Sequence, residues 1–289
     1  MRKRFVPVLT TAVVATALLA GCTSGTSGVM PPATLGEQTP LKSSTPAAPT
    51  ASSLSATSGG LVGGSTVTIS GTSLADVSAV KFGTVAATSV KATATSVTAV
   101  VPHAVDYQPS TVDVTVTGAS SSGLSYDYKV TDGVDREMQY AFQHWSAKAY
   151  NASFANFNAV GGDCQNFVSQ ALAARGLAQN DSWYYNSTGH SESWGYAPSF
   201  DTYLATTPSL GFTRLAATER SKLAIGDLAY FDWNDNGVPD HVMIVSAIAG
   251  SKISLVGHNL DYDYRDLDTA ITKDHPGADV WFYKVPASL

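Results

Sequence analysis

The sequence of 289 residues predicts a two-domain protein, in which an all-β sandwich precedes an α+β domain. Short β-rich runs separated by glycines fill residues 51–130. Beyond them, residues 131–289 hold 23 of the 28 aromatic side chains and all five tryptophans. In this second segment a helical pattern comes first, and two apolar strand-like runs follow it. We therefore expect a signal segment (1–21), a linker (22–50), a β domain (51–130) and an α+β domain (131–289).

The N-terminus has the order of a bacterial export signal. Three basic residues, Arg2 to Arg4, precede an apolar run from Phe5 to Ala20, which is short for a membrane span of about 20 residues. The run ends in Leu-Ala-Gly-Cys at residues 19–22, which resembles the lipobox of bacterial lipoproteins. This resemblance implies that Cys22 receives a diacylglycerol, becomes the first residue of the mature chain and anchors it to the outer face of a membrane. The alternative is an ordinary signal peptide with an incidental cysteine.

The rest of the composition excludes several classes of protein. Residues 23–50 are rich in Thr, Ser, Gly, Pro and Ala without a hydrophobic period, as in a flexible tether. Without residues 1–21, the chain has 14 basic and 23 acidic side chains, which argues against nucleic-acid binding. The two cysteines, Cys22 and Cys164, are too few for a disulfide framework or a multi-cysteine metal site. We expect a monomer without a cofactor.

The first domain has the pattern of an immunoglobulin-like sandwich. Its β-rich runs are 67–69, 77–82, 97–101 and 112–116, with glycines between them as turns. Three motifs, GGSTVTISGTSL (63–74), VKFG (80–83) and VVP (100–102), resemble the IPT/TIG domain. The resemblance implies an Ig-like fold but no ligand, so this domain is either a spacer or a module that binds cell wall or protein.

The second domain begins with two predicted helices. The first runs from about Asp135 to Asn151, capped by Asp132 or Asp135. The second follows Gly161-Gly162 and ends at Gly176, which places Cys164 near its N-terminus. The free N–H groups and the dipole of a helix start stabilise negative charge, so we expect a lowered thiol pKa and a nucleophilic sulfur. The same N–H groups can form an oxyanion hole. The alternative is a buried structural cysteine.

Among the six histidines, His241 is the predicted base. It starts the second strand of a hairpin that is formed by residues 226–233 and 239–245, whereas His103, His144, His190 and His275 fit surface or loop positions. A third polar group usually orients a catalytic imidazole. The next predicted strand, 252–256, leads to His258 and Asn259. Either of them can take this role, with some preference for Asn259, because an amide needs no control of its protonation state.

The blocks DCQNFVSQAL (163–172), GDL (226–228), FDW (231–233), DHVMIV (240–245) and HN (258–259) resemble a family of exported bacterial proteins, the "putative amidase domain" family. That family is similar to the NlpC/CHAP group of papain-like cell-wall hydrolases. The resemblance implies a papain-like α+β fold with Cys164 as nucleophile, His241 as general base and Asn259 or His258 as the orienting group. The sequence departs from the usual family pattern at Gln165 and Met243, which leaves substrate preference open.

Two further features allow alternative interpretations. Asp232, Asn234 and Asn236 match the first half of a calcium loop, but Met243 stands where the twelfth-position Glu belongs, so a polar hairpin turn competes with a weak calcium site. Aromatic residues also cluster near the predicted site, either lining a cleft for a glycan or peptide or only covering the surface. They are Trp183, Tyr184, Tyr185, Trp194, Tyr196 and, in the hairpin, Trp233.

Together these features predict a membrane-anchored, extracytoplasmic cysteine hydrolase that cleaves an amide bond. The resemblance implies peptidoglycan or a wall peptide as substrate, with the lipid bilayer as the second partner. The sequence does not separate an amidase from an endopeptidase. The alternative is a surface lipoprotein that binds cell wall or protein and whose papain-like domain no longer catalyses hydrolysis.

Overall fold

The computed structural model describes residues 47–289. The predicted signal peptide, Cys22 and the linker up to residue 46 lie outside the described residues. None of the helices between residues 47 and 289 has the length and apolar character that a membrane span requires.

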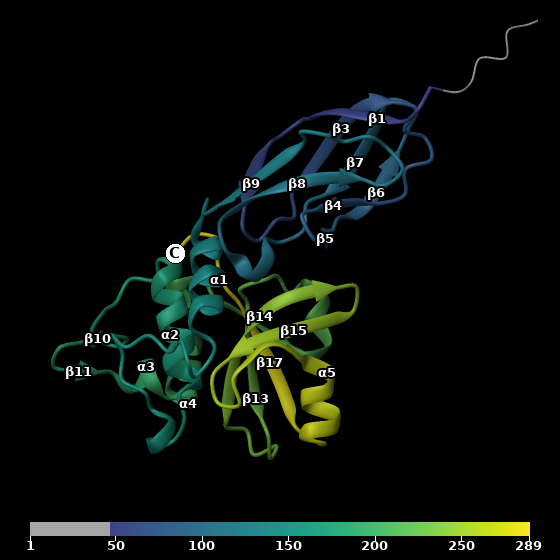
Figure 1. Cartoon of the computed structure of the whole chain (residues 1–289). Coiled ribbons are helices and arrows are strands. Elements are labelled where there is room, and N and C mark those ends of the chain that lie inside the picture. Colours follow the sequence, from purple (N-terminus) through teal and green to yellow (C-terminus); the bar gives the residue numbers. More distant parts are fainter. Residues whose placement is uncertain (1–46) are drawn as a thin grey trace, which may run out of the picture. The chain divides into compact units, whose positions relative to one another are not determined.

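The first domain consists of two β-sheets that enclose a common apolar core (Figure 1). In one sheet the order is β1 (Thr50–Leu54), β3 (Thr66–Thr72), β7 (Ser96–Val100) and β6 (Thr88–Ala92). In the other the order is β2 (Ser58–Gly60), β9 (Ser125–Lys129), β8 (Ser110–Val116), β4 (Val80–Phe82) and β5 (Val85–Ala86). Alternate residues such as Val67 and Ile69 point inward and are fully buried. The predicted sandwich is therefore confirmed, with added strands at both ends of the predicted runs.

The helices of the second domain begin where the sequence predicts. Helix α1 (Gly133–His144) starts at Asp132, whose side chain accepts a hydrogen bond from the N–H of Asp135. It ends at His144, seven residues before the predicted end. Helix α2 (Cys164–Arg175) has Cys164 as its first residue and stops at Gly176, which has a φ of 129°. Two shorter helices follow, α3 (Glu192–Gly195) and α4 (Ala197–Thr206).

A six-stranded antiparallel sheet forms the other half of this domain (Figure 1). Its order is β12 (Thr213–Ala216), β17 (Asp279–Lys284), β13 (Leu228–Asp232), β14 (His241–Ala249), β15 (Lys252–Gly257) and β16 (Tyr262–Asp266). The hairpin of β13 and β14 confirms the predicted one, with Phe231 opposite His241. The sequence did not predict β12, β16 and β17.

Both faces of this sheet are covered. Leu228 and Tyr230 of β13 belong to the core shared with α1 and α2, whereas Ala229 and Phe231 face the core below α5 (Leu267–Thr269) and the π-helical turn Ala270–Asp274. All five residues of β13 are buried for this reason. Helices α1 and α2 contact each other, and α2 packs against β14. The domain is thus a mixed α/β structure in which the start of α2 meets the start of β14.

Candidate active site

The turn before Cys164 depends on glycine. Gly161 and Gly162 have φ angles of 129° and 118°, a region that residues with a side chain rarely adopt. A Cβ on Gly162 would lie 3.2 Å from the side-chain oxygen of Asn259. The same oxygen accepts a hydrogen bond of 2.5 Å from the backbone N–H of Asp163. The glycine turn and Asn259 therefore fix the first turn of α2 and, with it, the position of Cys164.

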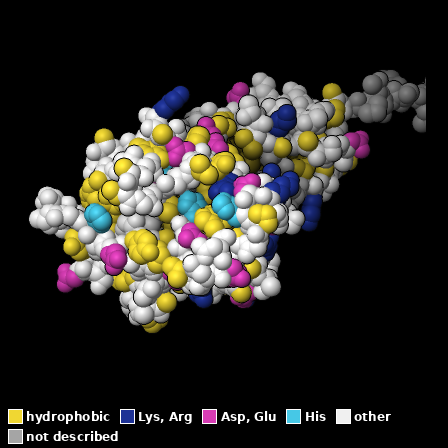
Figure 2. All heavy atoms as spheres, turned by 90° about the horizontal axis from the view of Figure 1, so that it is seen from below, with side chains coloured by type: hydrophobic (Ala, Val, Ile, Leu, Met, Phe, Trp, Pro, Cys, Tyr) yellow, Lys and Arg dark blue, Asp and Glu magenta, His cyan; other side chains and the backbone are white. Residues whose placement is uncertain are grey.

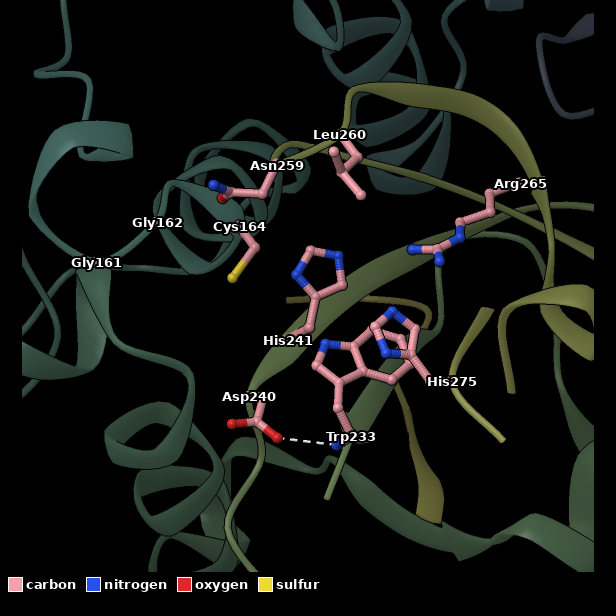
Figure 3. Close-up of a pocket in the computed structure, with 10 residues that line it drawn as sticks. All are labelled: Gly161, Gly162, Cys164, Trp233, Asp240, His241, Asn259, Leu260, Arg265 and His275. Carbon is pink, nitrogen blue, oxygen red and sulfur yellow. Dashed lines mark hydrogen bonds between the residues drawn. The ribbon is translucent and has the colours of Figure 1, made fainter. Parts of the chain in front are cut away.

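Cys164 and His241 face each other in one pocket (Figure 3). The side chains of Cys164 and His241 lie side by side, and the ring nitrogen next to the Cβ-bearing carbon, Nδ1, is on the side of the sulfur. The other ring nitrogen, Nε2, is on the side of Arg265. The pocket is lined by Gly161, Gly162, Cys164, Trp233, Asp240, His241, Asn259, Leu260, Arg265 and His275. The structure thus brings together the nucleophile and the base that the sequence predicts.

Burial makes both groups neutral at pH 7. Desolvation raises the pKa of Cys164 to about 11, although the backbone N–H groups of Val242 and Gln165 act in the opposite direction. Desolvation also lowers the pKa of His241 to about 3, and the charges of Arg265 and His275 add to this effect. The expectation of a lowered thiol pKa was therefore wrong for the resting site. The helix start does stabilise a thiolate, but only 8% of Cys164 is exposed, and desolvation outweighs it.

Neither predicted orienting residue reaches His241. His258 is buried and turned away, with Nδ1 2.6 Å from Oδ2 of Asp163 and Nε2 2.8 Å from the carbonyl oxygen of His144. Asn259 lines the pocket, but its amide bonds the N–H of Asp163 and the side chain of Asn158. Nε2 of His241 is buried and has no hydrogen-bond partner among residues 47–289. Both candidates instead contact Asp163, in the turn before Cys164, because the chain turns directly after β15, where Asn259 has a φ of 61°.

The sequence reasoning missed Arg265 and His275. Arg265 lies on β16, a strand that the sequence did not predict, and its side chain is 5% exposed. His275 follows the π-helical turn, and its ring stacks on Trp233 with centroids 4.0 Å apart. His275 lies in a loop, as predicted, but this loop follows the turn 270–274 back to the pocket, and His275 lines the pocket. Neither Arg265 nor His275 stands in a motif or in a clear hydrophobic period, so the sequence offered no signal for them.

The aromatic residues of the predicted cleft divide between the core and separate surface sites. Trp183 and Trp194 are fully buried, and their indole N–H groups donate to Ser169 and Asn166 of α2. Tyr184 lines a separate surface pocket with Gln179 and neighbouring polar residues. Tyr185 packs on Phe154, and Tyr196 is exposed beside a further pocket at Gly162. Of the predicted cleft residues, Trp233 is the one that lines the Cys164 pocket.

The calcium-like segment is a hairpin turn in the structure. The Asp232 carboxylate accepts hydrogen bonds from the N–H groups of Asn234 (3.3 Å) and Gly237 (2.6 Å). The side-chain oxygen of Asn236 accepts from Val238, and Asn234 donates to Asp240. Desolvation is the largest single influence and raises the pKa of Asp232, but the backbone N–H groups of the turn together hold this pKa below its ordinary value. Among residues 47–289, no three His, Cys, Asp or Glu side chains form a group that could hold a metal ion.

The two departures from the family pattern lie in the core. Gln165 is buried, donates to Ser169 (3.0 Å) and accepts from the Tyr230 hydroxyl (3.2 Å). Met243 is buried on the face of the sheet opposite α2 and packs against Gly257. Neither side chain lines the Cys164 pocket, so neither is placed to contact a substrate there.

Comparison with known families assigns both domains. The family described as "Putative amidase domain" matches residues 132–283, which is more than half of the chain. The family described as "IPT/TIG domain" matches residues 49–131. No curated protein matches the chain. The second match accounts for the β-sandwich, and the first contains Cys164, His241 and the whole pocket and indicates an amide hydrolase.

Proposed function

Because the chain belongs to the "Putative amidase domain" family, we propose that it is a cysteine hydrolase of amide bonds with a papain-like arrangement. The observation that carries this proposal is the pairing of Cys164 at the start of α2 with His241 at the start of β14 in one pocket (Figure 3). A nucleophile on a helix start and a base on a rigid strand hold a fixed geometry. This layout supports acyl transfer through sulfur.

The neutral resting pair determines the first step. As the sulfur attacks the amide carbonyl, Nδ1 of His241 takes the thiol proton, so no separate thiolate has to form in the buried site. The N–H groups at the start of α2 stabilise the oxyanion. The imidazolium then gives its proton to the leaving amine, which departs as the thioester forms. Water, deprotonated by His241, hydrolyses the thioester and restores the thiol.

The proposed substrate is peptidoglycan, either its stem peptide or the amide between peptide and sugar. Two features support it: the resemblance of the Cys and His blocks to cell-wall hydrolases, and an N-terminus typical of export. The test is digestion of purified cell walls by the full chain, with the released fragments identified by mass spectrometry. A shortened peptide that stays on the sugar with a new carboxylate indicates an endopeptidase, and release of the whole peptide with a new N-terminal amino group indicates an amidase. Cys164→Ala and His241→Gln are expected to abolish release while leaving the melting temperature close to that of the unchanged protein. Full activity of Cys164→Ala would exclude this mechanism.

A second candidate function is binding without turnover. The raised pKa of the buried Cys164 thiol favours it, because an unactivated thiol is a poor nucleophile. In that case the unchanged protein and Cys164→Ala both bind cell walls in a sedimentation assay, and neither releases fragments. Turnover by the unchanged protein excludes this candidate.

We also propose that Cys22 carries a lipid that holds the protein on the outer face of a membrane. The residue order before Cys22 supports this, since small residues and the cysteine follow an apolar run. A fatty-acid probe fed to expressing bacteria is expected to label the full chain and not Cys22→Ala. Cys164→Ala is the matched control, because it changes the other cysteine of the chain. Equal labelling of the Cys22→Ala protein would overturn the proposal.

A further inference from the structure

Arg265 is a buried cation on the wall of the catalytic pocket. Its side chain is 5% exposed, and Nη2 lies 3.0 Å from Oδ2 of Asp274. Its Nε is buried and has no hydrogen-bond partner within the described part of the chain. A guanidinium presents five N–H donors in a rigid fork, so a single bond to Asp274 leaves most of its donors unused. Buried donors without acceptors are costly, and a structural arginine would satisfy more of them.

Aromatic rings hold the guanidinium in place. Its carbon lies 5.6 Å from the ring centroid of Trp233 and 5.0 Å from that of Tyr262. Both distances fit cation–π contacts. The ring of His275 in turn stacks on the ring of Trp233. The cation is therefore preorganised, which lowers the entropy cost of binding an anion there.

Among the described residues, Arg265 is the one Lys or Arg side chain in the lining of the pocket. Figure 2 shows histidine side chains beside Lys or Arg side chains in a recess on this face. Asp274, the partner of Arg265, is 41% exposed and does not line the pocket. Asp240 does line it, but it lies away from Arg265 (Figure 3), and its Oδ2 accepts from the Trp233 N–H (2.8 Å) and the Asn234 amide (3.3 Å). An anion that approaches Arg265 is thus not opposed by a free carboxylate in the pocket lining.

We propose that Arg265 anchors a carboxylate subsite, so that the enzyme selects substrates with a carboxylate close to the scissile amide. His241 lies between Cys164 and Arg265 in the pocket (Figure 3), so a group held by Arg265 and a carbonyl carbon at the sulfur would occupy the same pocket. A carboxylate matches the planar fork of the guanidinium. Substrate selection by Arg265 rests on the proposed amide hydrolysis, but the first test of the subsite does not require the enzyme to hydrolyse a substrate.

The first test compares alkylation of Cys164 by iodoacetate and by iodoacetamide, which differ in one negative charge. Each alkylation rate at pH 8.5 is divided by the rate of the same reagent with a small free thiol. The normalised iodoacetate rate divided by the normalised iodoacetamide rate is the ratio that measures anion preference. We expect a ratio well above one for the full chain and about a tenfold lower ratio for Arg265→Gln, as one nearby charge predicts. Arg220→Gln is the matched control, since Arg220 pairs with Asp268 at 2.5 Å outside this pocket.

A second variant keeps the test decisive if Arg265→Gln fails to fold. Asp274→Asn removes the carboxylate that competes for Arg265 and is expected to raise the ratio. An unchanged ratio in a folded Arg265→Gln protein overturns the subsite, as does an unchanged ratio in Asp274→Asn when Arg265→Gln does not fold.

The substrate arm uses pairs of wall peptides that carry either a free carboxylate or a carboxamide beside the scissile amide. The unchanged enzyme is expected to show a KM several-fold lower for the carboxylate, and Arg265→Gln an equal KM for both. Equal KM values for the unchanged enzyme overturn selection by charge. An alkylation ratio that depends on Arg265, without hydrolysis of any peptide, leaves the anion subsite standing and refutes the proposed function alone.

Discussion

The Asp163 carboxylate lies 2.6 Å from Nδ1 of His258, and Asp163 directly precedes Cys164 in the chain. Its other oxygen accepts hydrogen bonds from the Phe157 N–H and the Asn166 amide, both at 2.8 Å. Nε2 of His258 faces the carbonyl oxygen of His144. The ring of His258 therefore bridges the Asp163 carboxylate and a backbone carbonyl of α1. This pair connects the start of α2 to the end of β15 and thereby fixes the position of the residue before Cys164.

Removing His258 is expected to destabilise the protein. His258→Ala leaves the Asp163 charge buried without its partner, which costs about 3–5 kcal/mol of unfolding free energy. Asn259→Ala removes one hydrogen bond at the same turn and is expected to cost about 1 kcal/mol. Chemical denaturation of both variants measures the difference. Equal losses for the two would show that the Asp163–His258 pair does not support the turn.

The reactivity of Cys164 is expected to rise only at alkaline pH. Its pKa is raised to about 11 and that of His241 is lowered to about 3, so no thiolate–imidazolium pair forms between these values. The rate of alkylation by neutral iodoacetamide should climb about tenfold per pH unit above pH 7 and show no plateau below pH 9. A plateau near pH 4–7, as an ion pair produces, would contradict this expectation. Cys164→Ala provides the background rate.

The same two groups make stability depend on pH. The depressed pKa of His241 means that, as pH falls from 6.5 toward 3, the unfolded chain binds a proton that the folded chain does not, and the free energy of unfolding decreases. The raised pKa of Cys164 means that stability present below pH 9 is lost as pH rises toward 11. Each loss is of the order of a few kcal/mol. Denaturation at a series of pH values measures this dependence. The free energy of unfolding of His241→Gln should vary less with pH below 6.5, and that of Cys164→Ala should vary less above pH 9. Unaltered pH profiles in these variants would refute the linkage.

Gly226 is expected to tolerate no side chain. It has a φ of 87°, and a Cβ there would lie 2.7 Å from Nη1 of Arg175 and 2.8 Å from Oε2 of Glu137, which form a buried ion pair. Gly226→Ala should cost about 3 kcal/mol or more, because it combines backbone strain with displacement of buried charges. Gly237→Ala is the control, with a φ of 82° and open space around it, and should cost about 1 kcal/mol. Melting temperatures of the two variants test this, and similar shifts would rule out the steric contribution.

The hairpin turn at Asp232 is expected to be stable without calcium. The carboxylate is occupied by turn N–H groups, so adding calcium or a chelator should leave the melting temperature unchanged. Asp232→Ala removes these acceptors and should cost about 1–2 kcal/mol. A rise of several degrees with calcium, absent in Asp232→Ala, would restore the calcium interpretation.

Local patterns in the sequence determined several secondary-structure elements and indicated Cys164 and His241 as a candidate pair. Glycines on either side of residues 163–175 set both ends of α2, and alternating apolar residues set the hairpin that starts β14 at His241. These signals are local, because a helix cap and a strand period depend on residues close in the chain. Cys164 and His241 could therefore be predicted as a pair before their positions were known.

Tertiary structure alone decided what surrounds that pair. The orienting residue was misassigned because His258 and Asn259 turn toward Asp163, 95 and 96 positions away in the chain. Burial of Cys164 reversed the expected direction of its pKa shift, and packing beneath α2 placed Trp183 and Trp194 in the core. Arg265 and His275 reached the pocket through a strand and a turn without a clear pattern. Desolvation and long-range contacts depend on which distant segments meet, so no local pattern encodes them.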